Sequence, residues 1–230
     1  MKNNAVLLII IAFAGALIIS VGVNLFVSPD FAGFGGELFG EPVVTYLSDR
    51  NGEGDGNTGN AYDKYDWNDH PVYIVGDSLT QGARNDISKT LGDVTIDAKV
   101  GRNMSTGLSI LRGWKDSGVL ADDAIIIVCL AHNITDSTVK DAQEVIAMIE
   151  PGQSLIMMTG HGRGNMEPIN EYLRSLPKAY SYITVADWDS TIAQSPSLLS
   201  DDGIHISRKQ GNEVYANLIM RALEETRPMR

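Results

Sequence analysis

The sequence predicts an α/β domain, a three-layer α/β/α sandwich with a five-stranded, mainly parallel sheet, preceded by one transmembrane helix. Three features predict it: short β-branched apolar runs, amphipathic stretches that alternate with them, and a long uncharged segment near the amino terminus. The alternation begins at Pro71. Strands that alternate with helices favour parallel pairing, with helices on both faces of the sheet.

Five apolar runs bounded by turn residues are predicted strands: residues 72–76, 94–100, 124–131, 154–160 and 182–188. Helical spacing of apolar residues predicts helices over about 79–91, 105–117, 136–149, 167–176 and 207–225. The last begins with Ser207 and Gln210, which have the spacing of a capping box. Parallel sheets bind ligands at the carboxyl ends of their strands, so functional side chains are expected directly after each run.

Residues 5–27 contain no charge, and only Ser20 and Asn24 are polar. At about 1.5 Å of rise per residue, a helix of this length can cross a hydrocarbon core of about 30 Å. A cleaved secretory signal is the alternative, but its apolar region is usually only about 7–15 residues long. We therefore expect residues 1–27 to be a membrane anchor.

Residues 28–70 are rich in Gly, Asn and Asp and are predicted to be a flexible linker before a catalytic domain at 71–230. The linker holds nine acidic and two basic residues, a charge of −7 out of −11 for the whole chain. Lys2 is the single charged side chain before the span. The positive-inside tendency then predicts a single-pass protein of the cell membrane with its catalytic domain extracytoplasmic.

Composition excludes several other classes. The excess of acid argues against nucleic-acid binding, which needs a basic face. A single Cys excludes an intramolecular disulfide and a multi-Cys zinc site. Asp49, Asn51, Glu53 and Asp55 fall at alternate positions, like the start of a calcium loop, but Asn60 replaces its final Glu. No cluster of metal-ligand residues appears elsewhere, and no metal or cofactor is expected.

The first predicted strand ends in Gly76-Asp77-Ser78-Leu79. A Ser at a strand-to-helix turn exposes its hydroxyl at the sheet edge and places its N–H at a helix start, where an anion is stabilised. The alternative is a helix cap, because Asp and Ser are both common there. This fragment alone does not decide between nucleophile and cap.

A second fragment, Asp202-Gly203-Ile204-His205, precedes the last predicted helix. An Asp three residues before a His can accept a hydrogen bond from Nδ1, which leaves Nε2 to take a proton from a Ser hydroxyl. An acidic surface turn is the alternative. The order Ser…Asp-x-x-His favours a catalytic triad of Ser78, Asp202 and His205.

These two fragments resemble the first and last blocks of the SGNH, or GDSL, hydrolases, which have a flavodoxin-like fold. The resemblance covers about residues 71–225. A closer likeness, carried by residues 97–102, 186–188 and 200–205, is to the extracytoplasmic catalytic domain of bacterial peptidoglycan O-acetyltransferases. It implies that Ser78 is the nucleophile, His205 the base and Asp202 the residue that orients it.

The resemblance also implies an oxyanion hole made by the N–H groups of Ser78 and Gly101 and the side chain of Asn133. A plain turn is the alternative reading of Gly101. The third block departs from the family, because Ala131 replaces its Gly and Ile134 its Asp. The acetyltransferase relatives also lack that Asp.

Four more residues are candidates for substrate binding: Asp77, His132, His161 and Arg163. His132 is an addition to the third block, and a spectator role is its alternative. His161 and Arg163 belong to a Gly-rich segment after the fourth strand, for which a plain loop is the alternative. Cys129 lies in an apolar strand and is expected to be buried and inert.

The sequence therefore predicts a membrane-anchored serine O-acyltransferase or esterase that acts on O-acetyl groups of cell-wall or surface polysaccharide. A multi-span membrane acyltransferase is the expected supplier of acetyl groups, and the O-acylated glycan the expected substrate. A carbohydrate or lipid esterase with the same triad is one alternative. A catalytically silent glycan-binding domain is another.

Overall fold

The computed structural model describes residues 65–207 and 209–230. Its centre is a five-stranded, fully parallel sheet of strand order β2-β1-β3-β4-β5. The strands are β1 Val72–Gly76, β2 Thr95–Ala98, β3 Ile125–Cys129, β4 Ser154–Met158 and β5 Ile183–Ala186. All five predicted strands exist, and four of them are shorter than their apolar runs, because the ends of those runs continue into the loops that follow.

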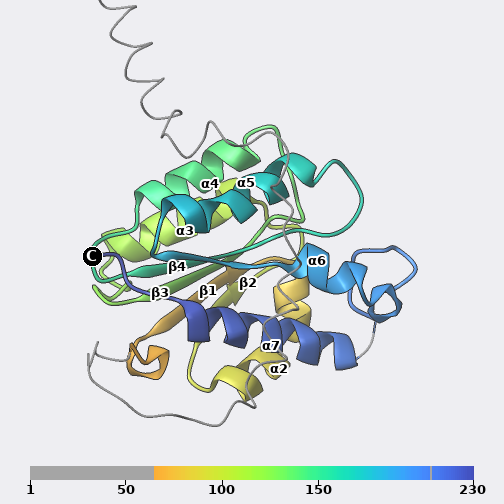
Figure 1. Ribbon diagram of the computed structural model, residues 1–230, viewed down its shortest axis with the longest axis horizontal. Helices are drawn as coiled ribbons and strands as arrows, with labels where there is room; N and C mark the ends of the chain where they lie inside the picture. Colours follow the sequence, from red (N-terminus) through yellow and green to blue (C-terminus); the bar gives the residue numbers. More distant parts are fainter. Residues whose placement is uncertain (1–64, 208) are drawn as a thin grey trace, which may run out of the picture. The chain divides into compact units, whose positions relative to one another are not determined.

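Helices cover both faces of the sheet, as predicted (Figure 1). One face carries α2 Ser78–Leu91 and α7 Lys209–Glu225, and the other carries α3 Met104–Asp116, α4 Thr138–Ala147 and α5 Glu167–Ala179. Successive residues of a strand point to opposite faces, so Ile74 joins the core under α2 and α7, whereas Val75 joins the other core. The fold is therefore the expected α/β/α sandwich.

Two details differ from the sequence-based expectation. A short helix, α6 Trp188–Ala193, follows β5 and is too short to show helical periodicity. The last helix is described from Lys209, and the hydroxyl of Ser207 before it donates to the carbonyl oxygens of Leu198 and Leu199. These bonds close the loop before α7, where a capping box was predicted.

Residues 65–70, which composition assigns to the linker, contact the domain. Trp67–Asp69 form a 3₁₀ turn, and Trp67 packs against the core. Tyr65 stacks on His70 with ring centroids 4.6 Å apart, and His70 Nδ1 lies 3.1 Å from an Asp123 carboxylate oxygen. Contact with the domain therefore begins before Pro71.

Among the described residues, no helix combines the length and apolar character needed to cross a membrane. The predicted span at residues 5–27 lies outside the described part of the chain, as does the linker up to residue 64.

The direction in which successive strands are added to the sheet reverses at β1, so the crevice between β1 and β3 is the switch point of the topology. Open α/β sheets bind ligands at this crevice, outside the carboxyl ends of the two strands. Ser78 follows β1 and Asn133 follows β3, so the topology brings two of the predicted site residues to this crevice.

Candidate active site

Ser78 is the first residue of α2, directly beyond the carboxyl end of β1. Asp77 caps the helix, since its Oδ1 accepts the Leu79 N–H at 3.0 Å. The turn requires Gly76, because a Cβ at that position would lie 2.2 Å from the Thr80 hydroxyl oxygen. Local sequence therefore fixes the Ser78 hydroxyl at the functional edge of the sheet.

The loop before α7 carries the other two members of the triad. Asp202 Oδ2 lies 2.6 Å from His205 Nδ1, and His205 Nε2 lies 3.0 Å from Ser78 Oγ. Asp202 Oδ1 accepts hydrogen bonds from the Ile204 N–H, the His205 N–H and the Ser200 hydroxyl, at 2.9, 2.9 and 2.7 Å. The structure therefore brings the three predicted residues into one connected chain.

Hydrogen bonding lowers the pKa of Asp202 below its ordinary value. The bond from the His205 ring is the largest cause, followed by the two backbone N–H groups and the Ser200 hydroxyl. Asp202 is therefore ionised at neutral pH and can hold the His205 Nδ1 proton. The His205 side chain is 51% exposed and that of Asp202 40%, so a large acceptor can approach the triad from solvent.

Two backbone N–H groups at the carboxyl ends of β1 and β2, those of Ser78 and Gly101, are unbonded. Among the described residues, no acceptor meets the N–H of Ser78 or that of Gly101. Gly101 lies in the turn after β2 with a φ of +73°, which favours glycine. The Asn133 side chain lies at the same edge and donates one Nδ2 hydrogen to the Arg102 carbonyl at 3.0 Å. Its second Nδ2 hydrogen is the one that a substrate oxygen would use.

Arg102 connects the pieces of this site, and sequence reasoning missed it. Its guanidinium, on a side chain only 6% exposed, bonds the carbonyl oxygens of Gly76 and Asp97 and the Asp97 carboxylate. Its own carbonyl accepts from Asn133. The turn after β2 is thus tied to both β1 and the loop after β3. The available signal in the sequence was the position of this basic residue, just after the predicted strand at 94–100.

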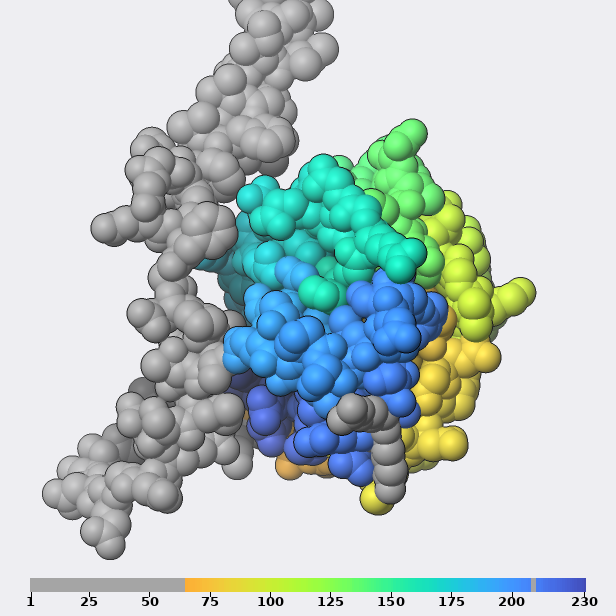
Figure 2. Space-filling model, turned by 90° about the vertical axis from the view of Figure 1, so that its right-hand side faces the viewer, coloured from red at the N-terminus to blue at the C-terminus, as the bar shows by residue number. Residues whose placement is uncertain are grey.

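Figure 2 looks onto the carboxyl edge of the sheet, where the segment after β4 lies beside the loop that precedes α7. The contact is close, because a Cβ on Gly162 would lie 2.8 Å from Ile204 Cγ1. The loop after β4 therefore lies against the turn that carries Asp202 and His205.

No profile of a known protein family matches the sequence. A sequence relative is YrhL of Bacillus subtilis (strain 168), whose name assigns it provisionally to the peptidoglycan O-acetyltransferases. The identity is 26% over 153 residues, which cover 66% of this chain and 24% of the relative. The chain therefore spans about a quarter of that protein.

Among solved structures, the carboxyl-terminal catalytic domain of Streptococcus pneumoniae peptidoglycan O-acetyltransferase A, with a methylsulfonyl adduct, has a TM-score of 0.64 at 20% identity. The match covers 70% of this chain and 97% of that one. A lipolytic G-D-S-L family protein from Veillonella parvula DSM 2008 has a TM-score of 0.53 at 16% identity, with 66% and 97% covered. The chain is SGNH-type in fold and O-acetyltransferase-like in sequence.

Two candidates for substrate binding in this SGNH-type fold are buried. The Asp77 and His132 side chains are 0% and 3% exposed, and Asp77 Oδ2 lies 3.1 Å from His132 Nδ1. In this conformation they present almost no surface to a ligand. They contact one another, and Asp77 is next to Ser78 in the chain.

The other two candidates lie in the loop after β4. His161 Nδ1 lies 2.8 Å from an Asp189 carboxylate oxygen, so its ring is held towards α6. Arg163 is exposed, and no described side chain pairs with it. Neither residue is hydrogen-bonded to the triad, although their loop contacts the turn that carries it.

A second network supports that loop and was also missed. Arg174 donates to both carboxylate oxygens of Asp187 and to Asp189, at 2.7–3.0 Å. Thr159, at the end of β4, donates to Asp187 at 2.8 Å. The Asp187-Trp188-Asp189 sequence at the end of the fifth predicted strand was the signal, because it places two acids at the functional edge.

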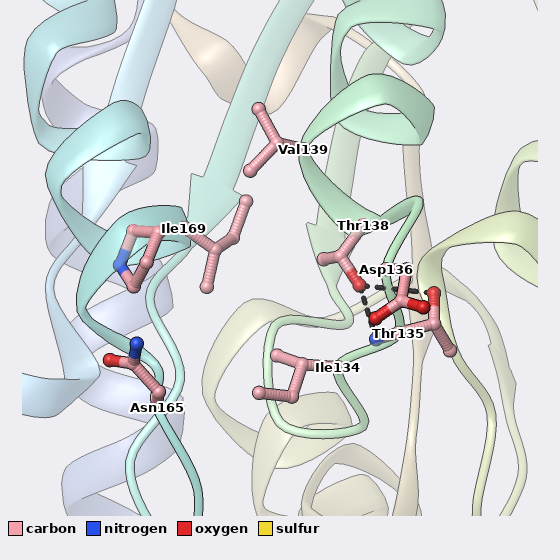
Figure 3. A pocket seen from close by; sticks show the side chains of 8 residues that line it. Ile134, Thr135, Asp136, Thr138, Val139, Asn165 and Ile169 are labelled. Atoms are coloured by element: carbon pink, nitrogen blue, oxygen red, sulfur yellow. Dashed lines mark hydrogen bonds between the residues drawn. The ribbon is translucent and has the colours of Figure 1, made fainter.

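A separate pocket lies between the loop after β3 and the start of α5 (Figure 3). Its lining combines aliphatic and polar side chains: Ile134, Thr135, Asp136, Thr138, Val139, Asn165, Pro168 and Ile169. No member of the triad lines it. It begins one residue beyond Asn133, so it adjoins the candidate site without containing the nucleophile.

Cys129 is not a candidate nucleophile. It is buried in β3, and burial raises the pKa of its thiol to about 12. Within residues 65–207 and 209–230, no group of three or more His, Cys, Asp or Glu side chains could hold a metal ion.

Proposed function

We propose that the chain is a membrane-anchored, extracytoplasmic serine O-acyltransferase that acts on O-acetyl groups of cell-wall or surface polysaccharide. The observation that carries this proposal is the connected triad of Ser78, His205 and Asp202 beside unbonded backbone N–H groups. The sequence relative and the solved acetyltransferase domain support the choice of acetyl transfer.

In the first half-reaction, Ser78 Oγ attacks an ester carbonyl carbon while its proton passes to His205 Nε2. Asp202 stabilises the imidazolium that forms. The N–H groups of Ser78 and Gly101 and the second Nδ2 hydrogen of Asn133 donate to the oxyanion. Loss of one such donor typically raises the barrier by roughly 3–4 kcal/mol. The tetrahedral intermediate then collapses, and the leaving alkoxide takes the proton from His205.

In the second half-reaction, His205 Nε2 accepts the proton of an incoming hydroxyl, which attacks the acetyl-serine carbonyl. Collapse of this intermediate breaks the bond to Ser78 Oγ, which recovers its proton from His205. A sugar hydroxyl gives transfer, and water gives hydrolysis. The exposure of His205 and Asp202 allows transfer, because a bulky polysaccharide hydroxyl can reach them, and the choice of transfer over hydrolysis is supported by the sequence relative and the solved acetyltransferase domain.

The location belongs to the same proposal. The uncharged segment 5–27 anchors the chain, and the domain faces outward. Acetyl groups must then be carried across the membrane by a partner, for which a multi-span acyltransferase is the proposed class. A carboxyl-terminal tag that is digested when protease is added to intact cells supports this orientation, and a protected tag contradicts it.

The two alternatives predict different products. A carbohydrate or lipid esterase would release acetate without acetylating a sugar. A silent glycan-binding domain, suggested by the altered third block, would leave the serine unreactive. The first measurement is therefore labelling of the detergent-purified full chain by methanesulfonyl fluoride, followed by intact mass.

We expect one methylsulfonyl group per chain, and none on Ser78→Ala. Ser88→Ala, an exposed serine on the same helix, should label like the parent. In the second measurement the chain is given p-nitrophenyl acetate and chitooligosaccharides of increasing length. Acetylated sugar supports transfer, free acetate alone supports the esterase, and equal labelling of Ser78→Ala removes the triad assignment.

A further inference from the structure

The residue before the nucleophile belongs to a pair of titratable side chains that the triad does not use. Asp77 and His132 come from the loops after β1 and β3, and their side chains are 0% and 3% exposed. Asp77 Oδ2 lies 3.1 Å from His132 Nδ1, but the two atoms are not hydrogen-bonded in this conformation. Neither atom has another partner in the described part of the chain.

Because both side chains are buried, water cannot supply the hydrogen bonds that Asp77 Oδ2 and His132 Nδ1 lack. A polar atom without a partner in an apolar site destabilises the fold, and a buried carboxylate group without a partner does so more strongly. The other carboxylate oxygen of Asp77, Oδ1, already accepts the Leu79 N–H and so caps α2. Oδ2 therefore needs a donor of its own. His132 Nδ1 is close enough to serve after a small rotation of its ring.

Other polar groups near Asp77 are already engaged. The hydroxyls of Thr80 and Tyr215 lie 2.9 Å apart and bond each other. Cys129 is near Asp77, but burial keeps its thiol protonated, and a thiol is a weak donor. Among the described residues, no other side chain meets Asp77 Oδ2. His132 is therefore the donor that the structure offers.

We propose that His132 is a positioning residue: by donating from Nδ1 to Asp77 Oδ2 it fixes the turn that carries the Ser78 hydroxyl and oxyanion N–H. The role rests on the proposed function, since it acts through the nucleophile. It also explains why a His at this place in the third block is buried and turned to Asp77.

The geometry predicts a graded set of variants. In Asn the amide Nδ2 is as many bonds from the backbone as Nδ1 of His, so His132→Asn can still donate to Asp77. In Gln the amide lies one atom further out, and in Leu there is no donor. We expect His132→Leu to lower kcat about 10- to 100-fold with KM changed less than about twofold. His132→Asn should keep at least a third of the parental kcat.

A double-mutant cycle tests whether the effect passes through Asp77. Asp77→Asn can still cap α2 through its amide oxygen, but it removes the second carboxylate oxygen that needs a donor from His132. In the Asp77→Asn background we therefore expect His132→Leu to change kcat less than threefold. Equal fold-losses in both backgrounds would overturn the proposal, because His132 would then act independently of Asp77.

The measurements are the hydrolysis of p-nitrophenyl acetate and the rate of methylsulfonyl labelling at Ser78, with full chains whose unfolding transitions are compared. Should His132→Leu fail to fold, His132→Gln takes its place, and we expect its kcat to lie below that of His132→Asn. If all three variants have the parental kcat, the inference about His132 is overturned. The proposed function still stands in that case, provided that Ser78 is labelled. An unlabelled, inactive parent overturns the proposed function itself.

Discussion

Ser78 Oγ and His205 Nε2 lie 3.0 Å apart, although 127 residues separate them in the chain. The contact exists because β1 ends beneath the loop before α7. That loop is closed by a bridge between Leu199 and Ile206 and by a 2.7 Å bond from the Ser200 N–H to the His205 carbonyl. The base is therefore presented by a tight turn, in which Asp202 holds both the backbone and the ring of His205.

Asp202→Asn should lower kcat/KM about 10³- to 10⁴-fold. The amide oxygen can still accept the backbone N–H groups, but the NH₂ group then faces His205 Nδ1 and favours the wrong tautomer. Steady-state hydrolysis of p-nitrophenyl acetate measures the loss. Asp201→Asn is the control, because Asp201 is an exposed neighbour whose side chain has no partner in the described structure, and it should keep parental activity. Equal activity of the two variants would contradict the role of Asp202.

Gly101→Ala should lower kcat about tenfold. A Cβ at this position would meet no atom within 4 Å, so the substitution acts through the backbone. An Ala is strained at a φ of +73°, and the backbone relaxes by a rotation that moves the N–H away from the oxyanion. Gly118→Ala is a matched control, with a φ of +70° and equally open space, far along the chain from the site. Both variants should lose about 1 kcal/mol of unfolding free energy. If kcat falls equally in both, Gly101 has no special role as an oxyanion donor.

The framework and the triad could be predicted because their signals are local. The β-branched runs mark the strands, and the residue types of Ser78, Asp202 and His205 at turn positions are chemically specific. The partners of buried charges could not be predicted. Arg102 and Arg174 act through contacts between loops, which depend on strand order and register rather than on local pattern.

His132 illustrates the limit most directly. Its position beside the third block indicates closeness to the site, but sequence reasoning could not tell a substrate contact from a buried partner. The structure places its ring against Asp77, because β1 and β3 are neighbours in the sheet. The segment 5–27 and its membrane role stay predictions, since they lie outside the described residues.

Arg102→Lys should reduce the unfolding free energy by about 2–4 kcal/mol, because an ammonium cannot make all three bonds of the guanidinium in its fork geometry. Activity should fall about 10- to 100-fold, since the turn that holds Gly101 loses its attachment to β1. Urea unfolding and ester hydrolysis measure the two effects. Arg112→Lys, at an exposed pair with Glu144, should change stability by less than about 0.5 kcal/mol. A stability change for Arg102→Lys as small as that of Arg112→Lys would be inconsistent with the bridging role.

Asp187→Asn should destabilise the protein in a pH-dependent way. Burial acts to raise the pKa of Asp187, but hydrogen bonds from Arg174 and Thr159 outweigh it, so the pKa is lowered. A lowered folded-state pKa stabilises the fold above the unfolded value of about 3.9, and the effect is lost as pH falls through the folded value. We expect a loss of about 1–3 kcal/mol at pH 7.

Urea unfolding of parent and Asp187→Asn at pH 7, 5, 4 and 3 tests this sign. The difference between them should be constant from pH 7 to 5 and shrink below about pH 4. Asp93→Asn, at an exposed residue whose side chain is unpaired in the described structure, should match the parent throughout. A difference that stays the same at pH 3 would show that Asp187 stabilises the fold through packing rather than through its charge.

Asn133→Ala should lower kcat about 10²- to 10³-fold, since the oxyanion loses a side-chain donor that the altered third block retains. One Nδ2 hydrogen is held by the Arg102 carbonyl, so the amide is already oriented before substrate arrives, and KM should change little. Asn165→Ala removes the same group from the neighbouring pocket of Figure 3 and should keep parental kcat. The comparison distinguishes the crevice between β1 and β3 from the pocket of Figure 3. A loss of kcat in Asn133→Ala alone would place the reacting carbonyl beside the crevice. Parental kcat in Asn133→Ala would leave the two backbone N–H groups as the whole oxyanion hole.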